Sequence, residues 1–198
     1  VIWNRGVNHD LFRPRSQENS YGPRPHWLCA GRVAVEKNIE AFLKLDLPGT
    51  KIIARDGPAR ASMQTKYPDA FWLGYKFGEE LAKIYADSDV FVFPSKTDTF
   101  GNVLLESIAS GTPVAAFPVP GPQDVLKPGV DGVLSENLKD ACLSALRLDR
   151  DVVHRSSMDW DWDAYFKTFL SHLAPIESSK FGYQFNEFDS PPILPTSE

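Results

Sequence analysis

The sequence predicts an α/β domain with a doubly wound parallel sheet. Short apolar runs of strand length alternate with segments of helical pattern along most of the chain, as in βαβ units. The runs are apolar almost throughout, which is typical of parallel strands covered on both faces. Clusters of charged residues and glycine follow individual runs, and ligands of such sheets bind beyond the carboxyl ends of the strands. We therefore expect a ligand site at that edge of the sheet.

The expected strands and helices alternate over most of the chain. Strands are expected at residues 26–30, 51–54, 70–73, 89–93, 113–117 and 132–134. Helical patterns occupy residues 38–45, 59–66, 79–86, 102–109 and 138–146. Gly111 and Pro113 are typical of the end of the helix at 102–109. This alternation predicts right-handed crossovers between parallel strands.

The last forty residues differ from the rest of the chain. Residues 160–170 form an aromatic-rich helical pattern, which lacks the Lys/Arg face of a membrane-surface helix and is expected to pack against a protein domain. Residues 176–198 contain several serines and prolines without helical or strand period, which predicts an extended or poorly ordered extension. We therefore expect one domain over residues 1–175, followed by this extension.

Composition and charge limit the function classes. The chain has 198 residues, 42% of them hydrophobic, and a net charge of −5, which argues against nucleic acid as a main partner. Cys29 and Cys142 are expected to be buried in a reducing compartment, and neither has a companion Cys or His at metal-ligand spacing. No apolar run approaches the ~20 residues of a membrane span, and no signal peptide is evident. The chain begins at Val1 without methionine, so we expect it to be a piece of a longer protein.

The segment 94–114 is the most informative part of the sequence. Asp98 precedes Glu106 with seven residues between them, and Gly101 stands at the expected start of the helix 102–109. A helix N-terminus attracts anions, and a residue without a Cβ lets a phosphate approach the backbone closely. Glu106 lies about 7.5 Å further along the helix, within reach of a ribose whose diphosphate lies at the helix end. For an isolated pair of acids, simple exposure to solvent would be the favoured interpretation.

A second charged cluster follows the expected strand 26–30. Gly31 ends the strand, and Arg32 and Lys37 come before the next helix. Arginine can bind two phosphate oxygens at once, while lysine supplies a compact positive charge. These cations would face the same cleft as Gly101, although isolated cations of this kind are usually exposed surface residues.

Both clusters resemble motifs of one large family. The segment 97–106, with 109–114 behind it, closely resembles the signature of the retaining glycosyltransferases of the GT-B fold, and 31–38 resembles their Gly-Arg, four residues, Lys-Asn element. The resemblance extends over residues 1–173 and implies a Rossmann-like domain, the C-terminal half of a GT-B fold, without the N-terminal acceptor domain. The chain departs from the family in having Asp98 where many members have Glu. It also has Arg55 in place of the first glycine of a Gly-Asp-Gly-Pro turn, which we interpret as structural.

The resemblance implies roles for individual residues. Arg32 and Lys37 would neutralise the diphosphate of a nucleotide-sugar donor, Glu106 would bind its ribose, and Asp98 would contact the transferred sugar. The other expected donor-binding residues lie in the same motifs or in the loop after the strand 70–73; they are Gly31, Tyr75, Lys76, Phe100, Gly101, Asn102 and Val103. For Tyr75, which would meet the base together with Lys76, core packing is an equal alternative.

The implied activity is retaining α-glycosyl transfer to an unknown acceptor, because lipids, glycans and small molecules all serve as acceptors in the family. GDP-mannose is the preferred donor because residues 5–7 and 97–102 look closest to members that use it, with a UDP-glucose-type donor as the alternative. No metal or other cofactor is expected, and the domain alone is expected to be inactive. We expect the protein to be cytoplasmic, and the full-length enzyme to associate with the membrane only as a peripheral protein, if at all. A nucleotide-sugar epimerase or a phosphorylase of the same architecture is an alternative, as is a non-catalytic nucleotide-sugar-binding module.

Overall fold

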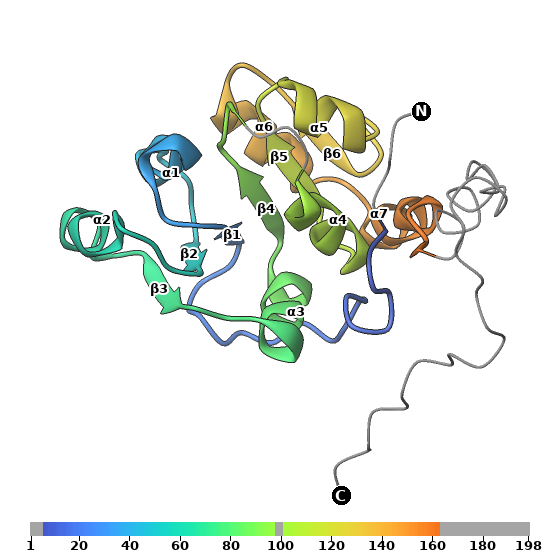
Figure 1. Cartoon of the computed structure of the whole chain (residues 1–198), viewed down its shortest axis with the longest axis horizontal. Helices are drawn as coiled ribbons and strands as arrows, with labels where there is room; N and C mark the ends of the chain where they lie inside the picture. Colours follow the sequence, from blue (N-terminus) through green and yellow to red (C-terminus); the bar gives the residue numbers. More distant parts are fainter. Residues whose placement is uncertain (1–5, 98–100, 163–198) are drawn as a thin grey trace, which may run out of the picture.

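Six parallel strands form the centre of the computed structural model, which describes residues 6–97 and 101–162 (Figure 1). The strands are β1 (His26–Ala30), β2 (Thr50–Ala54), β3 (Phe71–Gly74), β4 (Val90–Phe93), β5 (Val114–Ala116) and β6 (Gly132–Leu134). Their order in the sheet is β3-β2-β1-β4-β5-β6, and all neighbours pair in parallel. The order reverses between β1 and β4, which makes this the topological switch point of the sheet. The predicted fold class is confirmed.

Each strand carries apolar side chains on both faces. Along β1, Leu28 and Ala30 belong to one buried core, whereas Trp27 and Cys29 belong to the other. Side chains alternate between the two faces of a strand, so a run that is apolar throughout supplies two separate cores. This is why the strands lack the polar–apolar alternation of half-exposed sheets.

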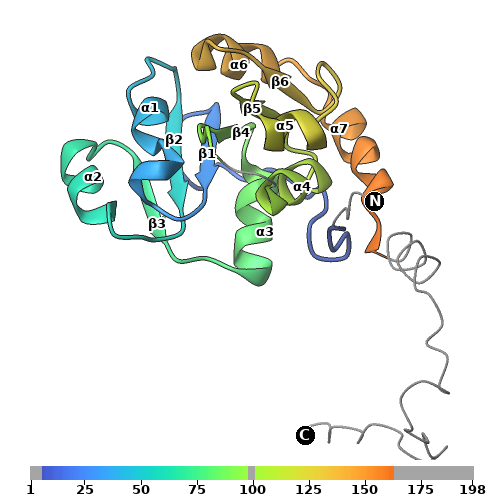
Figure 2. The ribbon, with the colours of Figure 1, turned by 45° about the horizontal axis from the view of Figure 1, so that its top comes forward.

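Seven α-helices are present in the described residues, and they cover both faces of the sheet (Figure 2). They are α1 (Ile39–Leu43), α2 (Arg60–Lys66), α3 (Gly78–Asp87), α4 (Asn102–Ala109), α5 (Pro120–Val125), α6 (Leu138–Ala145) and α7 (Arg150–Ser156). Two 3₁₀ turns, η1 (Val35–Lys37) and η2 (Ser157–Asp159), precede α1 and follow α7. Buried side chains of α3, α4, α5 and α7 join the core of Leu28, while those of α1 and α6 join the core of Trp27, against which α2 also packs.

All six expected strands and all five expected helices of the α/β alternation are present, with ends that differ by at most two residues. Two further helices, α5 and α7, lie where none was expected. Helix α5 begins with Pro120, which suits a first turn because its missing N–H would have no partner within the helix. Helix α7 begins after Asp149, whose carboxylate accepts hydrogen bonds from the amides of Asp151 and Val152. Most of the expected helix 160–170 and all of the extension 176–198 lie outside the described residues.

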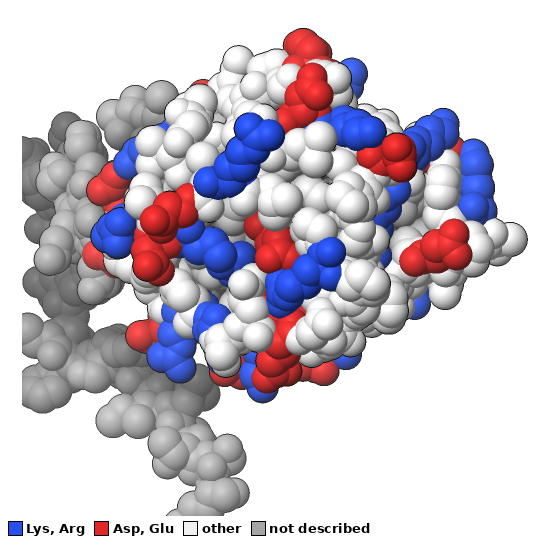
Figure 3. Space-filling view, turned by 180° about the vertical axis from the view of Figure 1, so that it is seen from behind, with Lys and Arg blue, Asp and Glu red and all other residues white. Residues whose placement is uncertain are grey.

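The distribution of charge on the surface and the burial of the two cysteines agree with the expectations from composition. On the face seen in Figure 3, basic and acidic side chains are interspersed rather than gathered into a basic stripe. Cys29 and Cys142 are both buried and unpaired, and burial raises the pKa of each thiol to about 12. In the described part of the chain, no helix combines the length and the apolar character needed to cross a bilayer.

Candidate functional site

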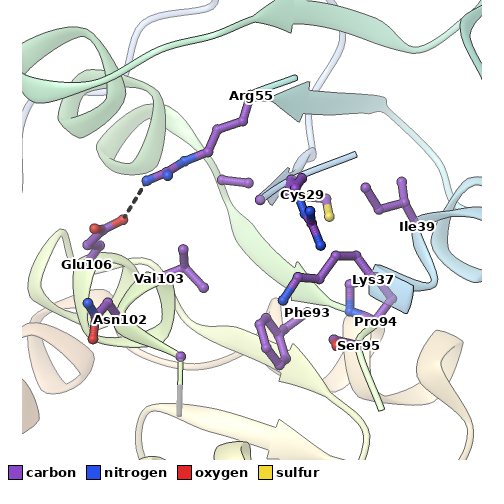
Figure 4. A pocket seen from close by; sticks show the side chains of 14 residues that line it. Cys29, Lys37, Ile39, Arg55, Phe93, Pro94, Ser95, Asn102, Val103 and Glu106 are labelled. Carbon is purple, nitrogen blue, oxygen red and sulfur yellow. Dashed lines mark ion pairs between the residues drawn. The ribbon is translucent and has the colours of Figure 1, made fainter. Parts of the chain in front are cut away.

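A cavity of about 350 Å³ lies at the carboxyl ends of β1 and β4, at the topological switch point (Figure 4). Its size falls in the range of small-molecule sites, and its position is the one in which open α/β sheets bind ligands. The ends of β1, β2 and β4 and the start of α4 contribute its lining. The lining residues are Cys29, Ala30, Gly31, Arg32, Lys37, Ile39, Arg55, Phe93, Pro94, Ser95, Gly101, Asn102, Val103 and Glu106.

The end of β1 brings glycine and two cations to the cavity. A Cβ atom added to Gly31 would meet no described atom within 4 Å, so the backbone there borders open space. Arg32 forms an ion pair with Glu36, the middle residue of η1, and its side chain is 65% exposed. Lys37 ends η1 and lines the cavity. Arg32 thus lines the cavity, while its guanidinium group is paired with the exposed carboxylate of Glu36.

The loops after β1 and β4 are joined next to these cations. Asn38, with a φ of +53°, links η1 to α1 in the left-handed conformation that asparagine tolerates. Its side-chain amide donates a hydrogen bond of 3.0 Å to the carbonyl of Pro94, which follows β4. This bond ties the segment that carries Lys37 to the opposite wall of the cavity.

The start of α4 forms the wall that follows β4. Gly101 is the N-cap of this helix and therefore adds no side chain to the helix end. A Cβ there would lie 3.1 Å from Cγ of Leu104, closer than most such contacts. Asn102 and Val103, the first residues of α4, line the cavity with it. The positive end of the helix dipole consequently faces the cavity, as an anion site requires.

Glu106 lies on α4, one turn further from the helix start. Its side chain is 17% exposed, and its Oε2 atom is buried without a hydrogen-bond partner among the described residues. Burial raises the pKa of this carboxyl group, while the positive charge of Arg55 and the neighbouring Tyr85 hydroxyl work in the opposite direction. The cavity thus holds a partly desolvated carboxylate that is able to accept hydrogen bonds.

Two of the cavity's polar side chains, Arg55 and Ser95, are not among the predicted site residues. Arg55, which we interpreted as structural, extends from the end of β2 toward Glu106, and its Nη2 atom lies 3.9 Å from Oε2 (Figure 4). Ser95, two residues after β4, is 1% exposed, and its hydroxyl has no partner among the described residues. Both follow strands that contribute to the predicted edge, so their position along the chain was the available signal.

Tyr75 and Lys76 are not brought to this cavity. Tyr75 is 65% exposed, with its ring centroid 6.0 Å from that of Phe77, so the alternative of core packing is wrong. The Lys76 ammonium group pairs with Glu80 at 3.0 Å. Their contact with a base stays a prediction.

The remaining predicted site residues are distributed as follows. Gly31, Arg32, Lys37, Gly101, Asn102, Val103 and Glu106 line one cavity. Asp98 and Phe100 lie outside the described residues, so their roles also stay predictions. The described residues include no group of three or more His, Cys, Asp or Glu side chains placed to hold a metal ion.

The lining offers two kinds of chemistry within one cavity. Lys37, Arg32 and the start of α4 provide positive charge for an anion, while Glu106 provides an acceptor for hydroxyl groups. A ligand that combines a phosphate-like anion with a polyol matches this arrangement.

Comparison with known proteins agrees with this chemistry. Residues 24–148 match the family model described as "Glycosyl transferases group 1". The GDP-mannose-dependent alpha-mannosyltransferase of Mycobacterium tuberculosis is 36% identical over 140 residues, which cover 67% of this chain and 37% of that protein. The sulfoquinovosyl transferase SQD2 of Arabidopsis thaliana is 30% identical over 190 residues, which cover 82% of this chain and 37% of that protein.

Solved structures show the same fold. The sucrose-phosphate synthase of Thermosynechococcus elongatus has a TM-score of 0.71 at 21% identity, over 85% of this chain and 50% of that one. The chain thus spans 37% of the length of both curated relatives and half of this solved structure.

Proposed function

The chain belongs to the group 1 glycosyltransferases, and on this premise we propose that it forms the donor-binding half of a retaining α-glycosyltransferase. The observation that carries the proposal is that Lys37, Gly101 and Glu106 line one and the same cavity, of about 350 Å³. In this proposal the cavity binds a nucleoside diphosphate sugar, and another part of the enzyme binds the acceptor.

The cationic side of the cavity would hold the diphosphate. Breaking the bond between the sugar and the diphosphate leaves negative charge on the nucleotide, so groups that already point at this charge lower the barrier. That Lys37 and the first residues of α4 line the same cavity supports this role. Arg32 would join them by leaving Glu36, which costs little because exposed ion pairs contribute little to stability.

Glu106 would bind the ribose, and Asp98 would bind the transferred sugar. The unpartnered and buried Oε2 atom of Glu106 supports the first role, since a desolvated acceptor is favourable only when a donor reaches it. The role of Asp98 rests on its place in the motif, in which seven residues separate it from Glu106. Both acids would thereby orient the donor while the diphosphate leaves.

GDP-mannose is the donor that we propose. The likeness of residues 5–7 and 97–102 to users of GDP-mannose supports it, as does the mannosyltransferase of M. tuberculosis. The relative from A. thaliana is a sulfoquinovosyl transferase, so the comparison by itself does not choose the sugar. Nucleotides with different bases must therefore be compared directly.

Calorimetric titration of the chain with GDP, UDP and ADP, followed by GDP-mannose and UDP-glucose, tests the proposal. We expect binding of GDP and GDP-mannose, and loss of at least tenfold in affinity in the double variant Arg32→Ala/Lys37→Ala, because charge-assisted hydrogen bonds contribute about 1.5–3 kcal/mol each.

The matched control is Arg147→Ala/Arg155→Ala, which removes the same net charge from two exposed positions outside the cavity lining. Equal loss of affinity in both double variants would show that only overall charge matters. Absence of binding to all three nucleotides would contradict the proposal that this chain forms the donor site. Product analysis of the complete enzyme with a labelled donor then separates transfer from epimerisation.

A further inference from the structure

Arg55 occupies an unusual backbone position at the edge of the cavity. Its φ of +90° falls in the region that favours glycine. The pairing of β2 with β3 shifts register at Ile53 and Ala54, directly before it, and its amide donates a hydrogen bond of 2.6 Å to the carbonyl of Gly74. A large side chain held in such a conformation points to a function of that side chain.

The geometry of Arg55 and Glu106 is that of an incomplete pair. The distance of 3.9 Å between Nη2 and Oε2 exceeds hydrogen-bond length. Among the described residues, Nε of Arg55, Oε2 of Glu106 and the hydroxyl of the neighbouring Tyr85 are all buried without a hydrogen-bond partner. By contrast, the nearby ion pair between Arg60 and Asp56 closes to 2.7 Å. A pair that served stability alone would be expected to close in the same way.

A hydroxyl group would complete this pair. A hydroxyl oxygen donates one hydrogen bond and accepts others, so it could donate to Oε2 of Glu106 and accept from Nη2 of Arg55. Two hydrogen bonds of about 2.8 Å reach across any separation up to roughly 5.6 Å, which includes the observed 3.9 Å. Without Arg55, Glu106 could still accept the hydrogen bond that such a hydroxyl donates, but the hydroxyl oxygen would lose the hydrogen bond that Arg55 donates to it.

We propose that Arg55 and Glu106 together bind a hydroxyl group of the donor's ribose, so that Arg55 is a ligand-contacting residue in this chain. The inference rests on the proposed function, because it takes the ligand to be a nucleoside diphosphate. It adds a binding residue that the motifs do not contain, at a position where the resembled turn has glycine. The alternative is that Arg55 only supplies positive charge near Glu106.

Ribose hydroxyls can be removed chemically, which separates these two roles. Calorimetric titration of the chain with GDP and with 2′,3′-dideoxy-GDP measures how much the hydroxyls contribute. We expect GDP to bind the unsubstituted chain at least tenfold more tightly than the dideoxy form. In Arg55→Gly, affinity for GDP should fall about tenfold while affinity for the dideoxy form changes little, so that the discrimination between them collapses.

Three further variants complete the test. Arg55→Lys keeps a donor and should retain part of the discrimination, and it also serves if Arg55→Gly does not fold, which thermal unfolding checks. Glu106→Gln should lose discrimination as Arg55→Gly does. Arg147→Ala removes an exposed charge outside the cavity lining and should leave the discrimination unchanged.

The outcomes distinguish this inference from the proposed function. If Arg55→Gly weakens GDP and its dideoxy form equally, or weakens neither, Arg55 does not contact the ribose and the inference is wrong. If the unsubstituted chain does not bind GDP, the proposed donor site itself is wrong and the inference fails with it. If it binds both nucleotides equally, the chain still binds the nucleotide, but the ribose hydroxyls contribute nothing and the inference alone is wrong.

Discussion

Burial raises the pKa of Glu106, so the folded chain contains a carboxylate that its surroundings disfavour. An acid of this kind holds its proton more readily in the folded chain than in the unfolded one. Stability is then lost as the pH rises from the ordinary value of 4.5 toward the raised folded value, and the loss persists at higher pH. A residue that weakens the fold at neutral pH is typical of a functional site.

We therefore expect Glu106→Gln to raise the free energy of unfolding at pH 7 by about 1 kcal/mol, with a smaller gain at pH 4, where the carboxyl group is largely protonated in both states. Urea unfolding at the two pH values measures this difference. Glu136→Gln, at an exposed position, is the control and should change stability little. A loss of stability in Glu106→Gln at pH 7 would contradict our account of Glu106.

The individual residues of the site were predicted unequally well from the sequence. Arg32, Lys37 and Glu106 stand in motifs whose order along the chain matches the order of their strands, so the sequence placed them at one edge. Arg55 could not be assigned in this way, because its contact with Glu106 depends on a left-handed backbone and on a neighbouring register shift. Neither feature follows from residue type, since arginine rarely adopts such a φ.

At the scale of single elements, α7 shows how a local signal fixes a short helix. The carboxylate of Asp149 accepts hydrogen bonds of 2.8 Å and 3.2 Å from the amides of Asp151 and Val152. These amides belong to the first turn and have no partner within the helix. Val153, in the same helix, is fully buried in the core that α4 also joins, so the cap supports an element that packs beside the cavity wall.

We expect Asp149→Ala to lower the free energy of unfolding by about 1 kcal/mol, because the two amides lose their acceptor. Asp149→Asn keeps a side-chain oxygen at the cap and should recover most of this loss. Thermal or urea unfolding measures both variants, and calorimetry should show unchanged affinity for GDP, since Asp149 does not line the cavity. Equal stabilities of the alanine and asparagine variants would show that the cap does not stabilise α7.

The strands were predicted more completely than the short helices. A parallel strand covered on both faces is a continuous apolar run, and six such runs were visible in the sequence. Helix α5 has only six residues and contains two prolines and a glycine, so helix propensity argues against it. Its Val125 is buried in the core together with α4, which indicates that tertiary packing rather than local preference stabilises this turn.

At the scale of the whole molecule, the cavity joins parts of the chain that lie far apart in sequence. Its lining comes from the ends of β1, β2 and β4, from η1 and the start of α1, and from α4, on both sides of the switch point. A ligand that binds there contacts segments which are held together only in the folded chain. Ligand binding and global unfolding should therefore be linked, and a nucleotide that binds the folded state alone must stabilise the entire domain.

We expect GDP at 100 times its dissociation constant to raise the free energy of unfolding by about 2.7 kcal/mol. For a domain of this size, that corresponds to a rise in melting temperature of about 5–10 °C. Thermal unfolding at increasing GDP concentration measures the effect, and the dissociation constant from calorimetry fixes its size in advance. Because its affinity should be at least tenfold lower, Arg32→Ala/Lys37→Ala should gain at most about 1.4 kcal/mol at the same GDP concentration, roughly half of the stabilisation of the unsubstituted chain. A shift of equal size in that variant would place the bound nucleotide outside the cavity at β1 and β4, because the cations of the cavity would then contribute nothing to binding.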